Sequence, residues 1–107
     1  MVPEITPREV ALQLANGQPL HLIDVRQPWE DRIAPLTGST LIPLNELPRR
    51  VGEIPRSVDA VILFCHHGIR SRSAGEYLMS LGYLSVFSMA GGIDAWSCEV
   101  DPNVPRY

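Results

Sequence analysis

The run Val61-Ile62-Leu63-Phe64 constrains the fold more than any other part of the chain. Four consecutive apolar residues leave no polar face for solvent, a pattern typical of a strand that is covered on both sides in a parallel sheet. A polar loop follows, and the pattern then predicts a helix over 71–82 that begins at a Ser/Arg cluster and stops at Gly82. Cys65 is therefore expected at the carboxyl end of a central strand, where open α/β sheets bind ligands.

Short apolar segments alternate with helical patterns along the rest of the chain. The stretch 5–9 predicts a helix start, with Thr6 as N-cap, Pro7 at the first helical position and Glu9 completing a capping box. Further strands are predicted at 20–25, 41–42 and 85–89, helical segments at 27–32, 45–51 and from 94, and a connecting loop at 52–59. The expected fold is α/β, one domain over 1–107, with a mainly parallel sheet and helices on both faces.

The loop from Cys65 to Ser71 combines a thiol with features that favour its ionised form. The first N–H groups of a helix have no partner within the helix, and inward-pointing N–H groups of a loop form an anion-binding hollow. A cysteine at its base is favoured as the thiolate. Gly68 permits a left-handed backbone, and Arg70 supplies a forked cation suited to oxyanions. Ser71 is expected to cap the helix, and its hydroxyl could also donate to the sulfur.

A cysteine that ends an apolar strand is, by its position alone, more often a small buried hydrophobe than a nucleophile. The neighbourhood of Cys65 argues for reactivity, because His66, His67, Arg70 and Arg72 lie within a few residues. A structural cysteine needs no such electropositive cluster. A metal site is not expected, since adjacent side chains do not easily converge on one ion and zinc requires four ligands, or three and a water. We likewise expect no cofactor.

Four segments of the chain, in the right order, resemble signatures of the rhodanese-like sulfurtransferases. The loop C-H-H-G-I-R-S at 65–71 looks like the active-site loop C-x-x-G-x-R-S of this family. The other three matches are L-I-D-V-R at 22–26 followed by Glu30, I-P-L at 42–44, and G-G-I-D-A-W at 91–96. The segment before Gly38 departs from the family pattern G-H-I-x-G-A because it lacks the histidine.

The resemblance implies a thiosulfate sulfurtransferase. The Cys65 thiolate would take the outer sulfur of a small anionic donor such as thiosulfate, and would pass it from a persulfide to cyanide in an assay, or to a thiol or protein acceptor. The catalytic residues are then Cys65 and Arg70, with Arg70 holding the oxyanion of the donor and the histidines adding positive potential. The expected substrate-binding residues are His66, His67, Gly68, Ile69, Arg70 and Ser71. Asp24 is expected to be structural, bonded to loop backbone or to an arginine.

Two other functions fit the same loop. Phosphatases and arsenate reductases of this kind read C-x5-R, whereas four residues separate Cys65 from Arg70 here and make a tighter cradle, better matched to one sulfur atom. A rhodanese-like binding module without catalysis is the other alternative, although such domains commonly lack the cysteine.

The remaining sequence features concern partners and location. A net charge of −3 argues against a nucleic-acid partner, and no apolar run approaches the ~20 residues needed to span a membrane. The chain opens without the segments of a signal peptide, so we expect a cytoplasmic protein with reduced cysteines. Cys98, next to Trp96 in the last helical segment, is either a resolving thiol for Cys65 or an inert half-buried residue, and the second is the simpler interpretation.

Overall fold

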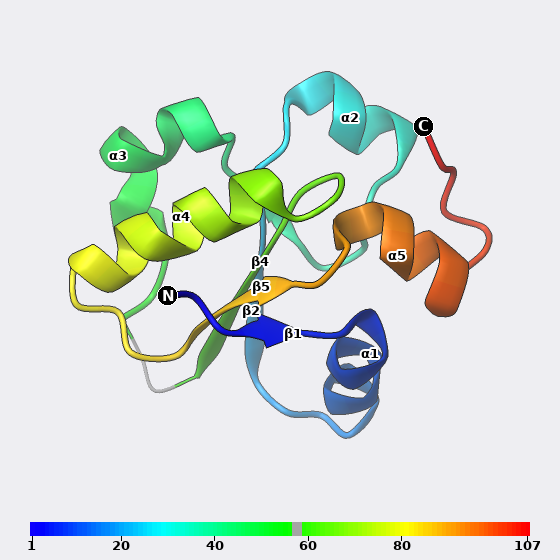
Figure 1. Ribbon diagram of the computed structural model, residues 1–107, viewed down its shortest axis with the longest axis horizontal. Helices are drawn as coiled ribbons and strands as arrows, with labels where there is room; N and C mark the ends of the chain where they lie inside the picture. The colour runs from blue at the N-terminus through cyan, green and yellow to red at the C-terminus, as the bar shows by residue number, and fades with distance from the viewer. Residues whose placement is uncertain (57–58) are drawn as a thin grey trace.

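Parallel strands form the centre of the fold, in a computed structural model that describes residues 1–56 and 59–107. Within these residues one sheet has the strand order β1-β5-β4-β2-β3 (Figure 1). The strands are β1 (Glu4–Ile5), β2 (Leu20–Asp24), β3 (Thr40–Leu41), β4 (Ala60–Phe64) and β5 (Val86–Met89). The helices are α1 (Pro7–Ala15), α2 (Pro28–Ile33), α3 (Leu47–Arg50), α4 (Ile69–Ser80) and α5 (Gly92–Glu99).

Strand β4 is the middle strand of the sheet, with β2 on one side and β5 on the other. Its side chains alternate between the two faces, as the period of a strand requires. Val61 and Leu63 join a core cluster that includes Leu47 of α3 and Leu78 of α4. On the opposite face, Ile62 and Phe64 join a second cluster, which α1 and α5 complete through Val10, Ile93 and Trp96. The predicted α/β fold with helices on both faces is confirmed.

The start of the chain differs from the sequence prediction by one short strand. Ile5, expected at a helix start, pairs instead with Met89 in the edge of the sheet. The helix begins after it, and its capping box is present as predicted: the Glu9 N–H donates to Thr6 Oγ1 and the Thr6 N–H to the Glu9 carboxylate, each at 3.1 Å. A strand of two residues carries no periodicity from which it could have been recognised.

The helical segment predicted at 45–51 is divided into three short pieces. A 3₁₀ turn over Leu44–Glu46 leads into α3, and a second 3₁₀ turn over Val51–Glu53 follows it. Pro48 lies in the first turn of α3, where its missing N–H costs no hydrogen bond. The predicted loop at 52–59 thus begins with 3₁₀ structure, and its residues 57–58 lie outside the described residues.

The C-terminal tail returns to α2, beside which it ends in Figure 1. There the ring of Tyr107 meets Trp29 edge-on, with 5.9 Å between ring centroids. Trp29 itself is half exposed, so it is a rim residue rather than a core one. Within residues 1–56 and 59–107, each helix is too short or too polar to span a bilayer.

Candidate active site

Cys65 directly follows the last residue of β4 and is 1% exposed. The chain then turns through residues 66–68 and enters α4 at Ile69, two residues earlier than predicted. Gly68, not Ser71, is the N-cap, with φ +113°, a backbone angle that favours glycine. The prediction that Ser71 caps α4 was therefore wrong: Ser71 is the third residue of the helix, and its side chain is completely buried.

The sulfur of Cys65 faces the start of α4. The backbone N–H of Gly68 donates to Sγ at 3.1 Å and that of Ser71 at 3.4 Å. The Ser71 hydroxyl oxygen lies 3.6 Å from the same sulfur. These N–H groups lie at the N-cap and in the first turn of α4, so they have no partner within the helix and lie at the positive end of its dipole. The arrangement favours negative charge on sulfur.

A second helix start fixes the carbonyl side of the loop. The N–H groups of Ile93 and Asp94, at the beginning of α5, donate to the carbonyl oxygens of Cys65 at 2.8 Å and of His66 at 3.2 Å. Gly92 makes this approach possible: a Cβ there would lie 2.4 Å from the Cys65 oxygen. Because the loop carbonyls point to α5, the loop N–H groups are free to face the sulfur.

Arg70 is tied to a carboxylate, which differs from its expected role as a free cation. Its two terminal nitrogens donate to the Glu30 carboxylate of α2 at 2.6 and 2.8 Å. Burial alone would raise the pKa of Glu30, but hydrogen bonds from Arg70, the Gln27 N–H and Tyr107 hold it at about 2. The pair is therefore ionised at neutral pH, and the charge of Arg70 is balanced before any substrate arrives.

A buried network continues from Glu30 into the core. Arg26 is completely buried and donates to both oxygens of Asp24, at 2.8 and 2.7 Å, and to the carbonyl of Ala34 at 2.8 Å. The hydroxyl of Tyr107 accepts from Arg26 at 3.3 Å and donates to Glu30 at 2.6 Å. Asp24 thus makes the bonds expected of a structural residue. Tyr107 could not be recognised from the sequence, because it lies 77 residues from Glu30 and belongs to no local pattern.

The comparison with known proteins agrees with this geometry. Residues 6–99 match the rhodanese-like domain. The chain belongs to the rhodanese-like family. It is 36% identical over 97 residues to a sulfurtransferase of Allochromatium vinosum, covering 91% of this chain and 90% of that protein. It is also 36% identical over 105 residues to the probable adenylyltransferase/sulfurtransferase MoeZ of Mycobacterium tuberculosis, covering 96% of this chain but only 26% of MoeZ.

A solved structure shows that the whole rhodanese-like fold is shared. The human single-domain sulfurtransferase TSTD1 superposes with a TM-score of 0.78 at 27% identity, covering 92% of this chain and 98% of that one. The predicted family is thereby confirmed. The relatives support sulfur transfer as the general class of reaction, and sulfurtransferase as the class of enzyme.

The two histidines of the rhodanese-like loop have different surroundings. The ring of His66 stacks on Tyr107, with 3.9 Å between centroids, and on His67, at 4.0 Å. Burial and then the neighbouring His67 lower the pKa of His66, which weakens the positive potential expected of this side chain. His67 is mostly exposed, and its Nδ1 lies 4.0 Å from the Asp94 carboxylate.

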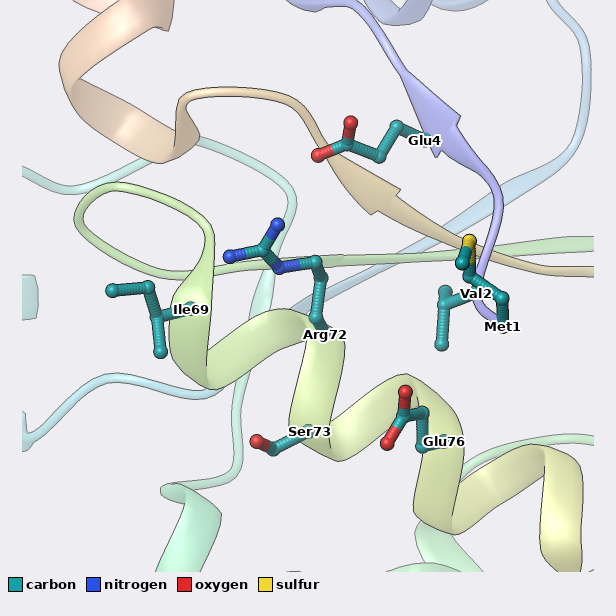
Figure 2. A pocket seen from close by; sticks show the side chains of 7 residues that line it. All are labelled: Met1, Val2, Glu4, Ile69, Arg72, Ser73 and Glu76. Carbon is teal, nitrogen blue, oxygen red and sulfur yellow. The ribbon is translucent and has the colours of Figure 1, made fainter.

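Ile69 and Arg72 lie on the outer side of the loop. Ile69 is 70% exposed and lines a pocket of about 440 Å³ between the start of the chain and α4. Figure 2 shows Arg72 reaching from α4 into the space between Ile69 and Glu4, apart from Glu76 on the next turn. Arg72 therefore contributes its charge to this outer pocket.

Both cysteines are free thiols in different environments. Cys98 is exposed, whereas Cys65 is buried. The half-buried position expected for Cys98 was wrong. Cys65, the buried thiol, is the one that accepts hydrogen bonds from two backbone N–H groups.

Proposed function

We propose that the protein is a sulfurtransferase that carries a sulfane sulfur as a persulfide on Cys65. The observation that carries the proposal is the pair of N–H groups, from Gly68 and Ser71, that point at Sγ. They stabilise an anionic sulfur without a metal or cofactor, in the same way that helix starts bind anions. The identities of relatives named sulfurtransferases support this choice among reactions of a thiolate.

The reaction has two displacement steps. The Cys65 thiolate attacks the outer sulfur of thiosulfate; a new S–S bond forms, the old one breaks, and its electron pair leaves with sulfite. A thiolate or cyanide then attacks the outer sulfur of the persulfide, and the electron pair of that S–S bond returns to Cys65. No net oxidation of the enzyme occurs over the cycle. Such two-step covalent catalysis predicts ping-pong kinetics.

The site is shaped for one additional sulfur atom. Only four residues separate Cys65 from Arg70, and Cys65 is 1% exposed, which favours a single sulfur atom over a larger group such as a phosphoryl group. Because Arg70 is already paired with Glu30, the negative charge of a donor depends chiefly on the backbone N–H groups of the loop. Arg70 then contributes by holding the first turn of α4 against α2. The remaining loop residues, His66 to Ile69, form the entrance.

The proposed partners are a small anionic donor and a thiol acceptor, either free or on another protein. The proposed location is the cytoplasm, where a reducing environment keeps thiols such as Cys65 and Cys98 free. Neither step calls for contact with nucleic acid or a membrane surface.

Intact-protein mass spectrometry after incubation with thiosulfate tests the proposal. Wild type should gain about 32 Da, one sulfur atom, and lose it again on addition of a thiol. Cys65→Ser should show no gain, whereas Cys98→Ser, which removes the exposed thiol, should behave as wild type. A gain retained in Cys65→Ser would refute the assignment of the nucleophile. No gain in reduced wild type with thiosulfate or mercaptopyruvate would refute persulfide transfer, and a phosphoester assay would then test the phosphatase alternative.

A further inference from the structure

The buried hydroxyl of Ser71, which lies near the Cys65 sulfur, contacts a second buried hydroxyl. Ser88 of β5 is completely buried, and its Oγ lies 2.6 Å from Oγ of Ser71. Among the residues that the structure describes, Ser71 is the only hydrogen-bond partner of this side chain. Val86, two residues earlier, packs with the face of the sheet that carries Cys65, so the strand period directs Ser88 to the same face. A polar side chain at this position of a buried strand is costly unless it is bonded.

The available hydrogens determine which hydroxyl donates when Cys65 is a thiol. Each serine hydroxyl has one hydrogen to give. The thiol of Cys65 donates to Ser71 Oγ at 3.6 Å, and Ser71 donates to the carbonyl of Gly68 at 3.1 Å. Ser88 has no other acceptor among the described residues, so its hydrogen goes to Ser71. All three groups are satisfied in this state.

Loss of the thiol proton reverses the hydrogen bond between Cys65 and Ser71. The proton passes to buffer or water, and the thiolate can only accept hydrogen bonds. The Ser71 hydroxyl then rotates its hydrogen from the Gly68 carbonyl to the sulfur. The carbonyl keeps a partner, because the N–H of Arg72 also donates to it at 3.2 Å. The oxygen of Ser71 still accepts from Ser88, so both hydroxyls and the Gly68 carbonyl remain bonded while the sulfur gains a third donor.

We propose that Ser88 is a positioning residue that stabilises the Cys65 thiolate through Ser71. It does not touch the sulfur itself. By donating to the Ser71 oxygen, the Ser88 hydroxyl leaves the Ser71 hydrogen available for the sulfur. It also polarises the Ser71 hydroxyl, because a hydrogen bond accepted by an oxygen strengthens the bond that the same oxygen donates. The inference deepens the proposed sulfurtransferase function, on which it rests for its biological meaning, but the ionisation of Cys65 can be measured without any sulfur donor.

The test compares Ser88→Thr with Ser88→Val, which have nearly the same shape and differ in the hydroxyl. The rate of Cys65 alkylation by iodoacetamide is followed against pH by mass spectrometry, in a Cys98→Ser background so that one thiol reacts. Ser88→Thr should keep the wild-type midpoint of the pH profile. Ser88→Val should move the midpoint to higher pH by about 1 unit, which is about tenfold less thiolate at a pH below both midpoints. Equal midpoints for the two variants would overturn the proposal.

Two further variants separate this role from a loss of packing. Ser97→Ala removes another buried serine, whose hydroxyl donates to the carbonyl of Ile93 at 3.0 Å, and should leave the midpoint unchanged. In a Ser71→Ala background, Ser88→Val should add no further shift, because the intermediate hydroxyl is gone. A shift that persists there would show that Ser88 does not act through Ser71. The alkylation midpoints could differ between Ser88→Val and Ser88→Thr as expected while the wild-type protein gains no sulfur from donors. That outcome would overturn the proposed function and leave the Ser88 inference intact.

Discussion

Replacing Gly92 by alanine should damage both the stability of the fold and the site. Gly92 has φ +62°, and a Cβ there would lie 2.4 Å from the carbonyl oxygen of Cys65 and 2.5 Å from that of His66. Both neighbours are backbone atoms, which cannot rotate away as a side chain would. Relief requires moving either the start of α5 or the cysteine loop itself.

The cost has two parts that can be separated. Holding alanine in the left-handed region costs about 1 kcal/mol. Forcing a methyl group into closely packed backbone costs about 2 kcal/mol more, within the range for overpacked cores. The expected loss of about 3 kcal/mol is a large share of the ~5–15 kcal/mol that stabilises a typical domain.

Chemical denaturation of three glycine variants measures these parts. Gly17 has φ +72° with nothing within 4 Å of an added Cβ, so Gly17→Ala should show only the backbone cost, about 1 kcal/mol. Gly52 has equally open space and no positive φ, so Gly52→Ala should be nearly neutral. Gly92→Ala should also form less persulfide with thiosulfate, because the loop must shift. If Gly92→Ala is no less stable than Gly17→Ala, the close contact between α5 and the loop is not the constraint that we infer.

Two further predictions concern the network beside the site. The pKa of Glu30, held at about 2, lies below its ordinary value of 4.5, so its contribution to stability is complete above pH 4.5 and declines as the pH falls toward 2. In urea titrations, wild type should exceed Glu30→Gln by about 3 kcal/mol at pH 7, and the difference should shrink below pH 4.5; a constant difference would refute the ionised pair. Tyr107→Phe removes the hydroxyl that donates to Glu30 and should cost about 1–2 kcal/mol of unfolding free energy. Tyr77→Phe is the control, since that hydroxyl bonds to no described residue, and equal losses in the two variants would contradict the role of Tyr107.

The starts of two helices, α4 and α5, contact opposite sides of the cysteine loop. The start of α4 presents N–H groups to the sulfur, whereas the start of α5 presents N–H groups to the carbonyls on the other side of the same loop. Each start follows a glycine with positive φ, Gly68 before α4 and Gly91 before α5. The proposed negative charge on the sulfur would therefore be stabilised mainly by backbone dipoles, which the surrounding helices hold in place before any substrate binds.

Local patterns in the sequence were enough to predict the fold class and the position of Cys65 at the end of a central strand. A continuous apolar strand, Val61 to Phe64, must be covered on both faces, and the residue after it must lie at the end of the sheet where loops gather. The glycine pair at 91–92 is part of the matched signature G-G-I-D-A-W, and the structure shows why a glycine is needed at Gly92, where backbone approaches the loop closely. The capping box of α1 was readable for the same reason, since its two partners are three residues apart.

What only the tertiary structure decided is how the charges and hydroxyls around Cys65 are partnered. Arg70 meets Glu30 from 40 residues away, Tyr107 meets it from 77, and Ser88 meets Ser71 from 17. A sequence shows that an arginine is present near a thiol, but its effective charge depends on which carboxylate the fold brings to it. The chain thus determined by itself where the thiol lies, through periodicity and turn residues that act locally. The electrostatics of that thiol arose from packing, because hydrogen-bond partners are chosen by distance in space and not along the chain.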